Sequence, residues 1–203
     1  MPCSSKAPAY WGNFIPAHWQ KGCLFTWQYD GLLPTKSQAG QDLVILALSP
    51  LTENPLFLDV GANDGITGNS SLLLEQKGWK GLLVEPNISL LSSLLEFRTS
   101  SVLVGAVASE NGILNLATSN IHTLGTCLVD DNSPEMQRLL RESGGACNID
   151  YMPSASFTLE MIYSYFIKSF SFPPTFLKLD IEGLEYSALA CSPPPPPGTY
   201  YFN

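Results

Sequence analysis

The chain has 203 residues, of which 45% are hydrophobic, and carries a formal net charge of -8. This length and composition suit one globular domain with a sizeable core. The acidic balance, without clusters of Lys and Arg, argues against nucleic acid or an anionic membrane surface as a partner. No apolar run in the sequence approaches the roughly 18 residues of a membrane-spanning helix.

The cysteines and histidines predict no metal site. Five cysteines, at positions 3, 23, 127, 147 and 191, form no Cys-x-x-Cys pair, and His18 and His122 are too scattered for a zinc site. We interpret the cysteines as reduced thiols of an intracellular protein. The N-terminus also lacks the apolar segment of a signal peptide, so cytoplasm is the default compartment.

Three regions follow one another along the chain. Residues 1–36 are rich in Pro, Gly and aromatic residues and predict an irregular lead-in. Residues 37–190 form the predicted domain, which begins with Ser37 as the N-cap of a helix over 38–48. Residues 191–203 form a tail with a run of five prolines, which cannot continue a helix.

Within the domain, apolar runs and helical periods alternate. The predicted strands are Leu56–Val60, Leu82–Glu85, Val102–Val107, Ile113–Ala117 and Thr175–Ile181. The predicted helices are Thr67–Lys77, Ile88–Phe97, 158–168 and one from about Leu184. Residues 119–150 are mostly loop-like, with a short helix near Pro134–Arg141. The alternation predicts an α/β fold with a parallel sheet covered on both faces.

Residues 57–65, Phe-Leu-Asp-Val-Gly-Ala-Asn-Asp-Gly, are the most informative segment. A buried-type strand runs into a turn with glycines at 61 and 65, and a helical pattern follows. Glycine permits positive φ angles and close approach of a ligand to the backbone. The free N–H groups at the start of the helix favour a negatively charged ligand group. The segment therefore predicts a nucleotide-binding turn.

Glu85 supports that interpretation. It ends the second predicted strand, 20 positions after Gly65. In a doubly wound sheet the ends of the first two strands are neighbours, so a carboxylate at this position can accept hydrogen bonds from both ribose hydroxyls. The alternative is a unit that binds no nucleotide and leaves Glu85 exposed.

The acidic residues around the turn favour one kind of nucleotide. A nicotinamide-binding turn would have the spacing Gly-x-Gly-x-x-Gly, whereas glycines here stand at 61, 65 and 68. Asp59 and Asp64 would repel a diphosphate but attract a ligand that carries a sulfonium and an ammonium group. The pattern therefore points to S-adenosylmethionine.

Several segments resemble the FkbM family of methyltransferases. They are residues 58–65 (Leu-Asp-Val-Gly-Ala-Asn-Asp-Gly), 84–87 (Val-Glu-Pro-Asn) and 177–185 (Leu-Lys-Leu-Asp-Ile-Glu-Gly-Leu-Glu), preceded by the Ser-Gln-Ala-Gly-Gln-Asp element at 37–42. The resemblance covers roughly residues 37–190. It implies a Rossmann-like class I methyltransferase fold, S-adenosylmethionine as donor, and O-methylation of a hydroxyl on a sugar or other natural product.

The resemblance also implies roles for individual residues. The methionine part of the cofactor would be surrounded by Asp59, Gly61, Asn63, Asp64 and Gly65. Glu85 would hold the ribose, and Ala108 and Ser109 would flank the adenine. Asp180, at the end of the last predicted strand, would face the transferred methyl group and is the candidate general base, with His122 a poorer one. The alternative for Asp180 is a carboxylate that only shapes its turn.

The C-terminal part departs from the family. A complete class I sheet has the strand order 3-2-1-4-5-7-6, and this sequence predicts strands for 3-2-1-4 only. We therefore expect the segment Phe176–Asp180 to have one unpaired side, which favours self-association. A truncated gene product, an expressed fragment and a chain completed by a partner all fit this pattern.

That departure limits the expected activity. We expect weak S-adenosylmethionine binding and poor or no turnover, because part of the acceptor site would be missing. One alternative is a non-catalytic remnant of the fold that serves as a binding module. An NAD-dependent oxidoreductase is a second alternative, which the glycine spacing disfavours.

Overall fold

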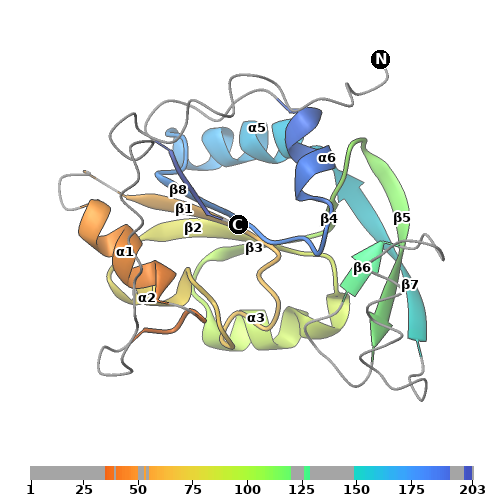
Figure 1. Cartoon of the computed structure of the whole chain (residues 1–203), viewed down its shortest axis with the longest axis horizontal. Coiled ribbons are helices and arrows are strands. Elements are labelled where there is room, and N and C mark those ends of the chain that lie inside the picture. Colours follow the sequence, from red (N-terminus) through yellow and green to blue (C-terminus); the bar gives the residue numbers. More distant parts are fainter. Residues whose placement is uncertain are drawn as a thin grey trace, which may run out of the picture.

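A computed structural model of the chain describes residues 35–38, 40–49, 53, 55–119, 126–128, 149–192 and 199–202. These residues form two sheets, with helices on both faces of the larger one (Figure 1). The larger sheet has five parallel strands in the order β3-β2-β1-β8-β9. The predicted α/β class and the parallel order around the first strand are confirmed.

The elements of this larger layer alternate along the chain. Its strands are β1 (Leu56–Val60), β2 (Lys80–Glu85), β3 (Ser101–Val104), β8 (Phe176–Leu179) and β9 (Tyr200–Phe202). The helices are α1 (Gln41–Leu48), α2 (Leu72–Gln76), η2 (Ile88–Leu90), α3 (Leu91–Phe97), α5 (Leu159–Phe170) and α6 (Glu185–Ala190). Among the described residues no helix is long and apolar enough to cross a membrane.

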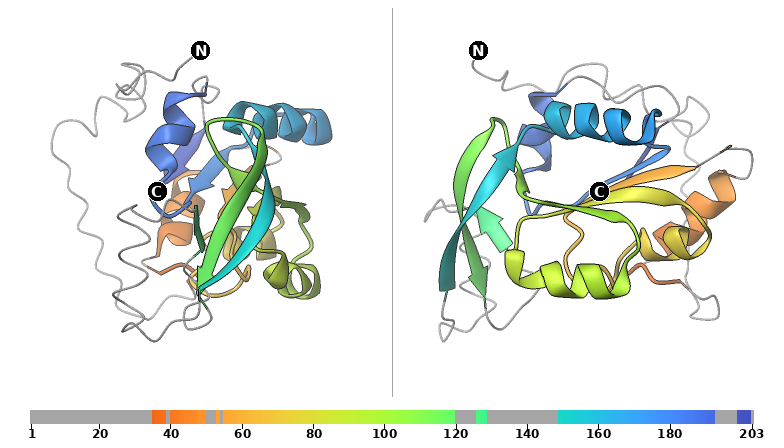
Figure 2. Two further views of the ribbon diagram at one scale, coloured as in Figure 1. Left: turned by 90° about the vertical axis from the view of Figure 1, so that its right-hand side faces the viewer. Right: turned by 180° about the vertical axis from the view of Figure 1, so that it is seen from behind.

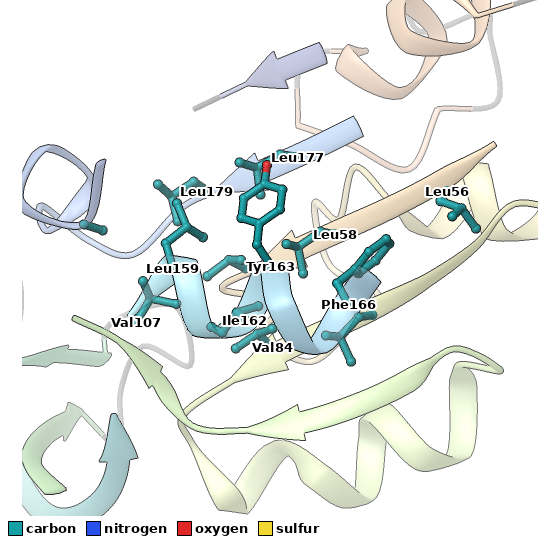
Figure 3. Packing of buried hydrophobic residues seen from close by; sticks show 13 residues of the cluster. Leu56, Leu58, Val84, Val107, Leu159, Ile162, Tyr163, Phe166, Leu177 and Leu179 are labelled. Atoms are coloured by element: carbon teal, nitrogen blue, oxygen red, sulfur yellow. The ribbon is translucent and has the colours of Figure 1, made fainter. Parts of the chain in front are cut away.

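Side chains that alternate along β1 and β8 build a separate core on each face of the sheet. On one face, Leu58 and Leu177 pack with Phe166 of α5 in a buried cluster (Figure 3). On the other face, Phe57 and Phe176 belong to a second buried cluster with residues of α1, α2 and α3. Packed side chains therefore cover both faces of the sheet at β1, which explains why this strand is buried along its whole length.

Two predicted helices begin later than expected. The helix predicted over 38–48 starts at Gln41 with Gly40 as its N-cap. Ser37 does not cap it but instead donates from its hydroxyl to the buried carboxylate of Asp42, at 2.9 Å. The helix predicted at Thr67–Lys77 is only Leu72–Gln76, because the Asn69 side chain accepts from the first N–H groups and holds the preceding residues in turns.

The strand predicted at Val102–Val107 breaks at Gly105 into β3 and β4 (Ala106–Val107). A Cβ on Gly105 would lie 2.4 Å from the Phe157 ring, so this close approach requires glycine. From this point the chain enters a second sheet of order β4-β7-β5-β6. Figure 2 shows its two long strands from two further sides.

The second sheet was largely missed by the sequence interpretation. Its remaining strands are β5 (Gly112–Ser119), β6 (Thr126–Leu128) and β7 (Ile149–Phe157). Only the strand at 113–117 was expected, and it is longer than predicted. Ser154 of β7 donates to the Pro86 carbonyl at 3.4 Å, which fastens this sheet to the turn after β2.

The expectation that the Phe176–Asp180 strand has an open side is wrong. β9 pairs with β8 in parallel, with Phe176 opposite Tyr200 and Lys178 opposite Phe202. β8 is therefore paired on both sides, and self-association through its edge loses its structural basis.

One further expectation is contradicted by the structure, and several others concern residues that the structure does not describe. Cys191 is disulfide-bonded, so the prediction of reduced thiols is wrong for this residue. The lead-in before residue 35, His122, the short helix near 134–141 and the proline run all lie outside the described residues.

Candidate active site at the carboxyl ends of β1, β2 and β8

The turn after β1 is held in one conformation by its neighbours on both sides. Gly61 and Gly65 have φ angles of 80° and 78°. The N–H groups of Gly61 and Ala62 donate to the Val84 carbonyl of β2 at 2.9 and 3.1 Å. On the β8 side, a Cβ on Gly61 would lie 1.8 Å from the Asp180 carbonyl oxygen. Gly61 is therefore required both by its backbone angle and by space.

Glu85 lies directly beside this turn, as the strand order predicted. Its side chain is buried, and its carboxylate accepts hydrogen bonds from the N–H groups of Asn63 at 2.8 Å and Asn87 at 2.9 Å. Burial raises the pKa of Glu85, although these two bonds oppose the rise. The alternative of an exposed Glu85 is wrong.

Asp59 is completely buried below the turn. Its Oδ2 accepts hydrogen bonds from Asn69 Nδ2 at 2.9 Å and Ser71 Oγ at 2.5 Å. Its Oδ1 lies 3.3 Å from the ammonium nitrogen of Lys178. The carboxylate is thus engaged by protein groups and supports the segment around the turn.

Lys178 is the first site residue that the sequence interpretation missed. It stands opposite Asp59 in the register of β1 and β8, and its Nζ donates to the Gly61 carbonyl at 2.7 Å. The same nitrogen lies 3.7 Å from Oδ2 of Asp180. Burial alone would lower the pKa of Lys178, but the facing carboxylates raise it, chiefly Asp59 and then Asp180. A lone charge in an apolar strand was the signal that could have revealed it.

Arg98 is the second missed residue, and it holds the other end of the turn. Its guanidinium is buried and donates to the Gly65 carbonyl at 3.0 Å and to Ser71 Oγ at 2.9 Å. Glu75 balances its charge at 3.2 Å. No local pattern identifies this role, because Arg98 simply follows a helix in the sequence.

The Asp64 side chain is hydrogen-bonded to the residues that follow it in the turn. Its Oδ1 accepts from the N–H groups of Ile66 and Thr67, each at 2.8 Å, and its Oδ2 accepts from the Thr67 hydroxyl at 2.6 Å. Burial would raise the pKa of Asp64, but these three bonds together lower it. The Asp64 carboxylate therefore stabilises the turn formed by residues 64–67.

Asn63 lies between the two glycines with a left-handed φ of 54°. Its backbone N–H is bonded to Glu85, but its side-chain Oδ1 is buried and accepts no hydrogen bond within the described residues. A buried acceptor of this kind is costly unless a ligand or solvent donor reaches it.

The remaining predicted residues surround these groups. Asp180 is half-exposed beyond the end of β8, with its N–H bonded to the Val60 carbonyl at 3.1 Å. Ala108 is buried after β4, and Ser109 beside it is exposed. Glu185, the first residue of α6, accepts from the N–H groups of Ile181 and Gly183. The described residues contain no group of three potential metal ligands.

Replacement of Gly61 tests the close contact between the turn and β8. We expect Gly61→Ala to lower the free energy of unfolding by at least about 2 kcal/mol more than Gly78→Ala. Gly78 also has a positive φ of 91°, but nothing lies within 4 Å of its added Cβ. Urea unfolding of both variants measures the difference, and equal losses would contradict the steric argument.

Comparison with known proteins agrees with this geometry. The family described as Methyltransferase FkbM domain matches residues 59–193, which is about two thirds of the chain. The matched range includes the turn, Glu85, Lys178 and Asp180. Searches of curated proteins and of solved structures found no match. The chain belongs to the FkbM methyltransferase family.

Proposed function

We propose that this methyltransferase uses S-adenosylmethionine to methylate a hydroxyl group of a sugar or other natural product. The observation that carries the proposal is the buried carboxylate of Glu85 next to the Gly61–Gly65 turn. The two backbone N–H groups that it binds use one acceptor position on each oxygen, so the buried carboxylate keeps further acceptor positions for a ligand. Two vicinal ribose hydroxyls are suitable donors to it.

The chain's own groups suit the rest of this cofactor. The Asn63 side-chain oxygen, which is buried and without a donor among the described residues, can accept from the cofactor's ammonium group. Gly61 and Gly65 keep side chains out of the turn, and Ala108 and Ser109 follow β4 on the adenine side. Asp59 acts indirectly, since its carboxylate is already engaged by Asn69, Ser71 and Lys178.

The charges at the strand ends favour a cationic donor. Asp59, Glu85 and Asp180 contribute three formal negative charges, and Lys178 contributes one positive charge. The excess is negative, which attracts a sulfonium and repels a diphosphate. In this proposal Glu85 and Asp180 are the carboxylates that favour the cationic donor, whereas the Asp64 carboxylate is hydrogen-bonded within its own turn.

When bound, S-adenosylmethionine would supply a methyl group on a positively charged sulfur, which can leave as a neutral thioether when a hydroxyl oxygen takes the methyl group. In this proposal the half-exposed Asp180 accepts the hydroxyl proton. The turn and the end of β8 are in direct contact, so the backbone that carries this carboxylate has a fixed position relative to the turn. Positioning of this kind supplies much of the rate when the leaving group is already good.

The ribose contact can be tested by calorimetry with S-adenosylmethionine. We expect Glu85→Ala to weaken binding about 10- to 100-fold, since hydrogen bonds to a charged group contribute about 1.5–3 kcal/mol. Glu160→Ala, which removes an exposed carboxylate at the start of α5, is the matched control and should bind like the wild type.

Two results would count against the proposal. Equal affinity of Glu85→Ala and wild type would refute the ribose contact. Binding without turnover on a panel of monosaccharides and polyols would favour the non-catalytic binding module over the enzyme.

The raised pKa of Glu85 also predicts opposite effects of acid on affinity and stability. Ionised Glu85 binds the ribose, so affinity should fall as the pH drops through this pKa, which lies above the ordinary 4.5. Acid has the opposite effect on folding. Because the pKa of Glu85 is raised in the folded protein, its contribution to stability is fully present below pH 4.5 and is lost as the pH rises through the folded-state pKa. Calorimetry and urea unfolding between about pH 8 and pH 4 measure both, compared with Glu85→Ala. An acid-dependent affinity that persists unchanged in Glu85→Ala would contradict this assignment.

A further inference from the structure

Lys178 carries a positive charge at a site that otherwise favours a cationic ligand. Its side chain is 12% exposed, and it is packed on a strand whose neighbouring residues Leu177 and Leu179 are fully buried. The carboxylates around it raise its pKa, so the ammonium form persists at neutral pH. A buried ion pair is costly, and apolar residues at both positions would avoid that cost. The stability of the fold alone therefore does not account for a charged residue at position 178.

The contacts of the ammonium group extend beyond a simple ion pair. The fully buried Asp59 lies 3.3 Å away on one side, and the half-exposed Asp180 lies 3.7 Å away on the other. Between them Nζ donates to the Gly61 carbonyl at 2.7 Å. One cation thus offsets two carboxylates that stand at the ends of neighbouring strands, at the edge where the donor is proposed to bind.

We propose that Lys178 is a specificity-determining residue that sets how strongly the site prefers the cationic donor over its neutral product. The inference rests on the proposed function, since S-adenosylmethionine and S-adenosylhomocysteine differ by one methyl group and one positive charge. Uncompensated carboxylates would stabilise the sulfonium form most, and Lys178 cancels part of that stabilisation.

This charge balance has a consequence for catalysis. The positive charge on sulfur disappears as the methyl group leaves, so nearby negative charges stabilise the bound donor more than the transition state. Interactions that favour the ground state do not accelerate the chemical step. By offsetting Asp59 and Asp180, Lys178 limits this excess stabilisation while it leaves Glu85 free for the ribose.

The test is the ratio of the two calorimetric affinities, S-adenosylmethionine over S-adenosylhomocysteine, at low constant salt. We expect Lys178→Met to raise this ratio about three- to tenfold, the effect of one unit charge in a partly solvated site. Lys178→Arg keeps the charge and should keep the ratio, and Asp180→Asn should lower it. General structural damage weakens both ligands together and leaves the ratio unchanged.

A second comparison tests the inference if the Lys178→Met variant does not fold. Asp59→Asn removes the buried negative charge, so the double variant with Lys178→Met has no buried carboxylate left without its cation. The ratio should be three- to tenfold higher in the double variant than in Asp59→Asn alone, again about one unit charge. Unchanged ratios in both comparisons would overturn the inference. If neither ligand binds the wild type, the proposed function fails instead, so the two failures are distinguishable.

Discussion

The contact between Asp59 and Lys178 is the interaction on which the arrangement of the strand ends depends. The two residues stand opposite each other in β1 and β8, on the sheet face that also carries Phe57 and Phe176. Each charge is buried, so the loss of either one destabilises the protein by leaving the other without its partner. Since the lysine also binds Gly61 and approaches Asp180, this one pair fixes the turn relative to the candidate base.

A continuous polar network extends from that pair below the turn. The Asp59 carboxylate bonds Ser71, Ser71 bonds Arg98, and Arg98 bonds both the Gly65 carbonyl and Glu75. The two glycines are thus held at opposite ends by two buried cations. Such pre-organisation leaves the Asn63 oxygen and the Glu85 carboxylate as the groups that a ligand can use, which links the fold to the proposed methyl transfer.

The sequence predicts those parts of the site that have a local signature. The glycine turn and Glu85 at the next strand end follow from spacing and strand order. Lys178 and Arg98 act on residues far away in the chain, so sequence spacing does not reveal their contacts, although the lone charge in an apolar strand marks Lys178 as unusual. The second sheet was missed for a different, local reason: Pro153 within β7 is atypical of a strand, yet it is tolerated because β4 pairs only with Ser156 and Phe157 of β7.

The most direct test of the account is a crystal structure of the protein with S-adenosylhomocysteine. The account predicts that both ribose hydroxyls bind the Glu85 carboxylate and that the ligand's ammonium group meets the Asn63 side-chain oxygen. A ligand bound away from the ends of β1 and β2, or one whose ribose makes no contact with Glu85, would contradict it.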